Sequence, residues 1–543
     1  MVRRKILKWY INRLVNFFKI FLRNKMGAIG LMIIVGFSIM AVAAPLLTDK
    51  DPIFDKNLAG YRAAPIWIKY LPTFLGGQPG LSENLQAIKN GQFINGTSGW
   101  QWNSTPHVLV MWNQTYGISP GSLEIKFIRD EVNVTYSNER AIVYYEFYYP
   151  FEGPPQRFFL TFSFSVHGKE FNSTQKIMYY DPELGRAVIK YIESKSLVAQ
   201  TSIRVFVSRL RDNKKYLFWP LKSGFENYRN VKMFNMSTLE QLGEEWISRK
   251  VDSNDAALKD ESFGGEPFIP SILFSGTPGY FRVIFEINFT DVYASKTALT
   301  SVNIDNVGMK CLGQAYGLLG TDEQGRDLWS QLVYGSRVSL YVGLLSALIS
   351  VALGLVVGLA AGFFGGVTDE ILMRFSDFLL VIPFLPLMMV LMAILGRTIM
   401  NFIILFALLG WMGFARVVRS QVLSLKERAF VEAAKAVGAG NTHIMLRHIL
   451  PNVMSLVYVT LATSVPGAIT AEAALSWLGF YDPTRMSWGR MLNGVYHLGG
   501  GQAMTNWWWV IFPGLCIALI AMAFIMLGFA LDEVLNPKLR LRR

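Results

Sequence analysis

The chain has 543 residues, of which 52% are hydrophobic and only 17% charged, and its formal net charge is +13. That length exceeds one ordinary domain. The sequence has only two cysteines and five scattered histidines, which exclude a disulfide framework and a metal site with Cys/His spacing.

Six long apolar stretches without a charged residue predict membrane-spanning helices. Buried helices of a large soluble protein are the alternative, but such helices rarely run so long without a charge. We therefore predict an α-helical multi-pass membrane protein. The six stretches are 27–47, 338–364, 378–396, 398–415, 453–471 and 506–531.

Basic residues gather beside these stretches. Residues 1–26 contain eight Lys/Arg and no acid, 412–451 carries a net +4 and 532–543 a net +2, so the rest is nearly neutral. This distribution argues against nucleic acid and for contact with membrane lipid. By the positive-inside rule both termini and the 412–451 loop are cytoplasmic, and 48–337 lies outside the membrane.

The N-terminal segment 1–26 is predicted to be an amphipathic lead-in helix on the inner membrane surface. Its apolar residues recur at helical spacing between Ile6 and Phe21. The segment is too basic, and the following apolar stretch too long, for a cleaved signal peptide. We expect 27–47 to remain as the first transmembrane helix.

Residues 48–315 form a large insertion with a different pattern. Short runs of alternating, β-branched and aromatic residues are separated by Gly, Pro, Asn and Asp, which predicts an extracytoplasmic β-rich domain, an antiparallel β-sandwich. Helices are expected only around 182–194 and 237–249. The predicted strands are 122–127, 141–149, 157–166, 203–207, 280–289 and 301–307.

All N-x-S/T sequons of the chain lie in this insertion. Their confinement to a segment already predicted to be outside indicates a glycosylated surface. The alternative is that β-rich loops simply favour Asn, Ser and Thr. The candidate asparagines are Asn95, Asn103, Asn113, Asn133, Asn172, Asn235 and Asn288.

The two edges of the insertion resemble the bracketing motifs of galactose-binding-like jelly rolls. These edges are 95–100, which reads N-G-T-S-G-W, and 302–307, which reads V-N-I-D-N-V. That fold often binds carbohydrate, and Trp100, Trp102 and Trp112 could stack on sugars, although such residues more often lie in a core. We expect a docking or protective cap rather than a sugar site.

Four motifs follow in order along residues 316–543, the part of the chain that follows the insertion. Residues 319–327 read L-G-T-D-E-Q-G-R-D, residues 432–438 E-A-A-K-A-V-G, residues 471–479 A-E-A-A-L-S-W-L-G, and residues 536–540 N-P-K-L-R. Together they resemble the second, C-type permease subunit of ABC importers of the oligopeptide, dipeptide and nickel class. The first motif supplies the family signature residues Gly320, Thr321, Asp322, Gly325, Arg326 and Asp327.

The resemblance implies a type I importer permease of six transmembrane helices, in which the cytoplasmic loop 427–451 docks on a separate ATPase. From the residues, 427–437 should be a short helix ended by Gly438 and Gly440. A second helix should be capped by Asn441 or Thr442 and stopped by Pro451. The alternative is a plain solvated loop. The predicted docking residues are Glu432, Ala433, Ala434, Lys435, Gly438, Arg447, His448 and Pro451.

No G-x-x-x-x-G-K-[ST] phosphate-binding loop occurs in the sequence, so the chain is predicted to bind no cofactor itself. The resemblance implies ATP and Mg²⁺ on two partner ATPase subunits, a homologous permease as heterodimer partner and an external solute-binding protein. It implies transport and no bond chemistry. Glycosylation beside such motifs suggests an archaeal source.

The expected cargo is an oligopeptide or dipeptide, with oligosaccharide as the alternative. A membrane-anchored surface protein that binds glycans is a rival from another class. Within the spans, Pro383, Pro386, Pro466 and Gly467 are gate candidates, because such residues free backbone groups where a cavity can satisfy them. Glu472 is either functional or paired with an arginine.

Overall fold

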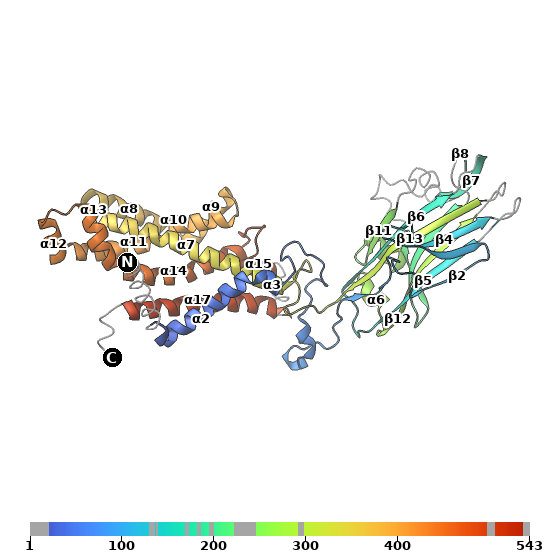
Figure 1. The fold of residues 1–543 in the computed structure, drawn as a ribbon, viewed down its shortest axis with the longest axis horizontal. Helices are drawn as coiled ribbons and strands as arrows, with labels where there is room; N and C mark the ends of the chain where they lie inside the picture. The colour runs from blue at the N-terminus through green and yellow to red at the C-terminus, as the bar shows by residue number, and fades with distance from the viewer. Residues whose placement is uncertain are drawn as a thin grey trace, which may run out of the picture. The chain divides into compact units, whose positions relative to one another are not determined.

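The computed structural model describes residues 21–129, 136, 139–168, 173–181, 186–194, 200–221, 246–290, 298–496 and 505–535. The chain divides into two compact units (Figure 1). One, called here the helical unit, comprises Met1–Lys56 and Gly317–Arg543. The other, the β unit, comprises Asn57–Tyr316. Most of the predicted lead-in helix 1–26, up to residue 20, lies outside the described residues.

In the part of the helical unit that the structure describes, five helices are long and apolar enough to cross a membrane, or six if one bent pair counts as a single span. The helices are α2 Lys25–Val42, α3 Ala44–Leu47, α7 Leu328–Phe364, α8 Gly366–Val381, α9 Phe384–Leu395, α10 Ile399–Gly410, α11 Met412–Lys426, α12 Ala429–Ala436, α13 Asn441–Ile444, the π-helical turn η4 Met445–Ile449, α14 Leu450–Trp477, α15 Trp488–Tyr496 and α17 Trp507–Leu535.

The predicted span 378–396 is wrong as one straight helix. It is divided between α8 and α9, whose axes bend by 88°. Ile382 is extended, with ψ 128°, and Pro383 begins α9 as its N-cap. A proline pushes the residue before it out of the helical region, and this accounts for the break.

Helix α7 is the central helix of its unit and packs on α2, α8, α10, α11 and α14. Glycines permit its close approach to α11: a Cβ on Gly358 would lie 2.6 Å from the carbonyl oxygen of Ala415, and one on Gly362 would lie 2.9 Å from that of Arg419. Small residues of this kind are how membrane helices pack closely. Arg419 also donates to Asp369 at 2.5 Å, which joins α11 to α8.

The β unit is built from two antiparallel sheets and a hairpin (Figure 1). One sheet has the order β11-β6-β13-β4-β3 with β1 beside β13, the second has the order β10-β9-β12-β5-β2, and β7 pairs with β8. Alternate residues of both sheets point into one shared core. The strands are β1 Leu85–Gln86, β2 Trp100–Ser104, β3 Val108–Asn113, β4 Ser122–Arg129, β5 Glu139–Tyr149, β6 Arg157–Gly168, β7 Ser173–Asp181, β8 Arg186–Ser194, β9 Gln200–Arg209, β10 Lys214–Trp219, β11 Ile247–Asp252, β12 Gly279–Thr290 and β13 Ala298–Leu312.

All six strands predicted from the sequence are strands in the structure, namely β4, β5, β6, β9, β12 and β13. The two predicted helices are wrong where the structure describes them. Residues 186–194 form β8, which pairs with β7, and 247–249 open β11, which pairs with β6. Cross-strand pairing overrides the local pattern there. Among the described residues of this unit, the α-helices are α5 Ala256–Ser262 and α6 Ile269–Leu273, and two short 3₁₀ helices are η1 Ile66–Tyr70 and η2 Thr73–Leu75.

Candidate functional site

The predicted docking loop lies at one end of the helical unit, where α12 and α13 project beyond α11, and α3 and α15 lie at the opposite end (Figure 1). Its inner face is anchored by apolar side chains. Val431, Ile444 and Ile449 are fully buried and join the core that α11 supplies with Val418 and Val422. Burial of such side chains gives about 1.5–3 kcal/mol each, so the loop is fixed to the membrane helices.

The outer face of the loop carries both charge and exposed apolar area. Glu432, Ala433 and Lys435 are exposed, and Val437 is 90% exposed and Leu446 53%. Exposed apolar side chains beside charged ones are typical of a contact surface. Of the other predicted docking residues, Ala434 packs against the anchoring core, Arg447 and Pro451 are exposed, and His448 is half-buried.

The turn after α12 is a Schellman motif. Gly438 has φ +84°, its N–H donates to the Lys435 carbonyl at 2.9 Å, and the Ala439 N–H donates to the Ala434 carbonyl at 3.0 Å. A residue with a Cβ is strained in that conformation, so Gly438 ends the helix as predicted. The cap of α13 differs from the prediction: Gly440 is the N-cap, and no side chain caps it.

The prediction that Pro451 stops the second helix is wrong. Helix α13, the turn η4 and α14 run on as a single candidate span, Asn441–Trp477, and Pro451 lies in the first turn of α14. Before it, the Leu450 N–H bonds to the Met445 carbonyl, five residues back. Proline has no N–H to donate within a helix, and its ring collides with the carbonyl four residues earlier. The wider π turn before Pro451 accommodates the proline without ending the helix. The second helix therefore belongs to the transmembrane span.

At the other end of the unit, the G-T-D-x-x-G-R-D motif forms a closed turn before α7. The Asp322 side chain is 1% exposed. It accepts hydrogen bonds from the Gln324 N–H at 2.8 Å, the Arg326 N–H at 3.0 Å, the Arg326 Nε at 2.6 Å and the Gln331 Nε2 at 2.7 Å. Gly320 and Gly325 have φ of +79° and +69°, which let the chain turn back on itself.

The last residue of the motif, Asp327, caps α7. Its carboxylate accepts from the Ser330 N–H at 2.9 Å and from the Ser330 hydroxyl at 2.6 Å, which satisfies free donors at the helix start. Burial raises the pKa of this carboxyl. The backbones of Thr321 and Asp327 form an isolated antiparallel β-bridge that closes the turn. Nearby, burial and the charge of Arg326 lower the pKa of Arg490.

Glu472 lies near the C-terminal end of α14 and is buried, with 6% exposure. Its Oε1 accepts from the hydroxyls of Ser476 and Ser487, each at 2.7 Å. Its Oε2 has no hydrogen-bond partner. The expected arginine partner is not found among the residues the structure describes, so that alternative is wrong there. Ser487 was missed, since it lies outside the motif on another segment.

We predict that Glu472→Gln keeps the fold, because its side-chain oxygen can still accept from Ser476 and Ser487. Glu472→Leu should lower stability by about 2–4 kcal/mol, because both buried hydroxyls lose their acceptor. Thermal unfolding of the detergent-purified variants measures this. A leucine variant as stable as the original would contradict the structural role of the carboxylate.

The gate candidates occupy three places. Pro383 and Pro386 are exposed, at the bend and in the first turn of α9. Pro466 is buried inside α14. A Cβ on the exposed Gly467 would meet nothing within 4 Å. The prolines therefore lie at a bend and inside a helix, and their positions do not identify residues that line the pathway.

The sequons differ in availability. Asn95 and Asn103 are exposed, whereas Asn288 is half-buried. Asn113 donates to Glu124 at 3.0 Å and accepts from the Thr115 N–H at 3.0 Å, so its side chain is occupied. The remaining sequons, Asn133, Asn172 and Asn235, lie outside the described residues, as does the tail motif 536–540.

Of the three tryptophans named for sugar stacking, Trp100 belongs to the core of the β unit and the partly buried Trp112 packs against that core. Trp100 is buried, and the Trp112 indole donates to the Phe93 carbonyl at 2.8 Å. Trp102, 40% exposed, is the exception.

Comparisons with known proteins match both ends of the chain. Residues 354–541 match the model of the binding-protein-dependent transport system inner membrane component. Residues 13–65 match the N-terminal TM domain of oligopeptide transport permease C.

Curated relatives agree with these matches. The dipeptide transport system permease protein DppC of Bacillus subtilis is 40% identical over 41% of this chain and 68% of its own length. The oligopeptide transport system permease protein OppC of Haemophilus influenzae is 40% identical over 41% of this chain and 71% of its own. Among solved structures, TmCBM61 in complex with β-1,4-galactotriose aligns with a TM-score of 0.21 and 11% identity, over 41% of this chain and 97% of that module.

Proposed function

The chain belongs to the family of inner membrane components of binding-protein-dependent transport systems, as a C-type permease subunit of oligopeptide and dipeptide ABC importers, and we propose that it lines part of the translocation pathway and docks on an ATPase through residues 427–451. It is a transport subunit and not a catalytic one, and ATP hydrolysis is carried out by partner ATPases.

The observation that carries the docking proposal is the two-sided loop. Val431, Ile444 and Ile449 fix one face to the membrane helices, while Glu432 and Lys435 are exposed on the other. A rigid anchor with an exposed charged and apolar face transmits a force from a bound partner to α11 and α14. A plain solvated loop would not need three fully buried anchors.

The remaining partners follow from the same proposal. A homologous permease completes the pathway, a second ATPase binds that partner, and an external binding protein delivers the peptide. ATP and Mg²⁺ bind to the ATPases. Closure of the ATPases draws the docking loops together and opens the pathway outward, and hydrolysis resets it. In this arrangement both termini and the loop are cytoplasmic, and residues 48–337 are outside.

The β unit adds a domain on the outer side. Two antiparallel sheets with one shared core support a β-sandwich of the jelly-roll kind. Glycosylation at the exposed Asn95 and Asn103, and an archaeal source, stay proposals from the sequence. The named relatives transport dipeptides and oligopeptides, so no specific observation favours the oligosaccharide importer or the glycan-binding surface anchor.

The test is peptide-stimulated ATP hydrolysis by the assembled complex in lipid nanodiscs. Oligopeptides with their binding protein are expected to raise the hydrolysis rate, whereas oligosaccharides of similar mass should leave it at the basal level. A complex stimulated only by oligosaccharides would overturn the peptide assignment.

A further inference from the structure

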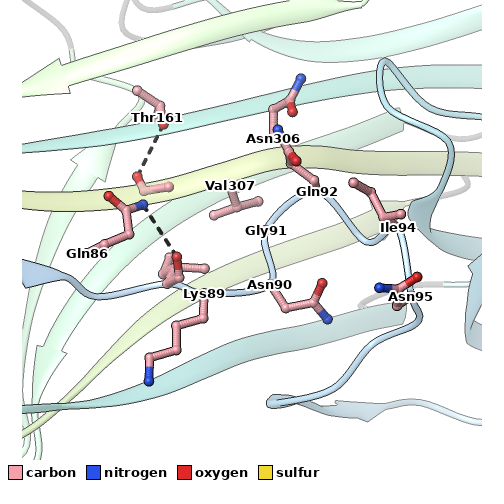
Figure 2. A pocket seen from close by; sticks show the side chains of 12 residues that line it. Gln86, Lys89, Asn90, Gly91, Gln92, Ile94, Asn95, Thr161, Asn306 and Val307 are labelled. Atoms are coloured by element: carbon pink, nitrogen blue, oxygen red, sulfur yellow. Dashed lines mark hydrogen bonds between the residues drawn. The ribbon is translucent and has the colours of Figure 1, made fainter. Parts of the chain in front are cut away.

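The β unit contains a hollow of about 540 Å³, and residues of both edge motifs, Asn95 of 95–100 and Asn306 and Val307 of 302–307, lie in its lining. It is lined by the loop that follows β1, by β6 and by β13 (Figure 2). Small-molecule sites have volumes of about 300–1,000 Å³. The hollow is therefore large enough for a ligand of a few residues.

The wall of the hollow is held rigidly. Strand β13 bulges between Asp305 and Gly308, and Asn306 there has φ +51°, which is uncommon for a residue other than glycine. The Val307 N–H donates to the Gly91 carbonyl at 2.9 Å. A Cβ on Gly91 would lie 1.6 Å from the Val307 carbonyl oxygen, so only glycine allows this approach. Bulges and left-handed residues of this kind are over-represented at functional sites.

A second anchor fixes the loop on its far side. Phe93 is fully buried and has φ +49°. Its carbonyl accepts from the Trp112 indole at 2.8 Å, and its ring packs on Trp100 at 5.3 Å. The polar side chains of this loop are thus presented from a backbone fixed at Gly91 and Phe93, which lowers the entropy cost of binding a ligand.

The lining is rich in amides and has one cation. Five side-chain amides, one lysine and one threonine line the hollow, with no carboxylate and no aromatic ring (Figure 2). Asn90 already donates to the carbonyls of Gly96 and Ser98. For Lys89, Gln92 and Asn306 no side-chain hydrogen bond to another described residue is found, so three polar groups remain available to a ligand. Asn95 also lines the hollow, but it is a glycosylation candidate and the binding proposal does not use it.

We propose that this hollow binds the carboxyl-terminal end of a short peptide, and this rests on the peptide-import function proposed above. Each side-chain amide offers a donor and an acceptor, as a peptide group does. Lys89 supplies a charge-assisted bond for the terminal carboxylate. An amino terminus would find no carboxylate in the lining, and a sugar would find no ring to stack on. The β unit thereby holds cargo by its carboxyl end.

The test uses the full chain in nanodiscs, produced in a host that adds no N-glycans, and fluorescence anisotropy of an amino-terminally labelled hexapeptide of alternating Ala and Ser. The free-acid peptide should bind, and its carboxyl-terminal amide should bind at least about tenfold more weakly. Lys89→Gln should reduce binding of the acid to the level of the amide. Asn306→Asp, which keeps a residue that tolerates left-handed φ, should also weaken it.

The matched control is Lys215→Gln, which removes an exposed lysine on β10 away from the hollow and should leave binding unchanged. The proposal is overturned if acid and amide bind equally, if neither binds, if Lys89→Gln has no effect, or if only an oligosaccharide binds in a Lys89-dependent way. Peptide-stimulated ATP hydrolysis in the assembled complex with Lys89→Gln tells the two proposals apart: stimulation that persists while this site fails leaves the importer function standing.

Discussion

Glu432→Lys is expected to reduce ATP-dependent peptide uptake at least about tenfold without changing expression or membrane insertion. The side chain of Glu432 is exposed, so reversing its charge should leave the fold intact. The new lysine would face the cation that we expect the partner ATPase to present to Glu432. Uptake into proteoliposomes and the amount of ATPase retained by the tagged chain measure the effect.

The control for this variant is Asp532→Lys, which reverses another exposed acidic charge near the end of α17, outside the docking loop 427–451. It should transport normally. Normal uptake by Glu432→Lys would refute the docking role of this residue.

A second pair of variants tests the geometry of the same loop. Gly438→Pro should abolish uptake, because proline cannot adopt φ +84° and lacks the N–H that Gly438 donates to Lys435. Gly440→Ala is the matched control, since Gly440 has φ −67° and open space around its Cβ position. Normal uptake by Gly438→Pro as well as by Gly440→Ala would show that the Schellman turn does not position the docking face.

Asp322→Ala is expected to cost about 3–5 kcal/mol of stability, because it leaves the guanidinium of Arg326 buried without its carboxylate. That side chain is 12% exposed, and its Nε bonds to Asp322 at 2.6 Å. The alanine also removes an acceptor from Gln331. Thermal unfolding of the purified chain in detergent measures the change.

Two variants control for the position and the charge. Glu323→Ala, at the neighbouring half-buried residue, should unfold at the original temperature. The unfolding temperature of Asp322→Asn should lie between those of the unchanged protein and Asp322→Ala, because asparagine keeps the shape of the side chain but not the charge. If Asp322→Ala unfolds at the same temperature as the unchanged protein, the signature motif does not stabilise the start of α7.

Alternation and hydropathy predicted the parts of the fold where one local rule acts alone. The strand β5 is an example, since Ala141, Val143 and Tyr145 are buried in alternation with more exposed neighbours. The apolar stretches likewise predicted most of the membrane helices, because burial in lipid requires long uncharged runs. These signals lie within a single segment, so the sequence alone reveals them.

Proline was the main source of error, because its effect depends on the hydrogen bonds of the preceding turn. Pro383 breaks the α8–α9 pair, whereas Pro451 sits in a continuous helix behind a π turn. The sequence shows both prolines, but it does not show whether the hydrogen bonds of the preceding turn are of the α or the π type. The helix predicted at 182–194 failed because residues 186–194 pair as β8 with the preceding strand β7, and the spacing of residues within one segment does not show that pairing.

The candidate sites show the same division. The G-T-D-x-x-G-R-D motif was visible in the sequence, but its role as a clamp depends on Gln331, which stands outside it. Glu472 was named from its place at a span end, while its contact with Ser487 comes from a different segment. The wall of the hollow in the β unit depends on the hydrogen bond between Val307 and Gly91. These residues are far apart in the sequence, so no local pattern predicts the contact.

The most direct test of the central claim is the rate of ATP hydrolysis by the complete complex, measured with and without oligopeptide, for the unchanged chain and for Glu432→Lys. We expect peptide to stimulate the unchanged complex, whereas the variant chain should either fail to assemble with its ATPase or show no stimulation. Equal stimulation of both complexes, or stimulation of neither, would contradict it.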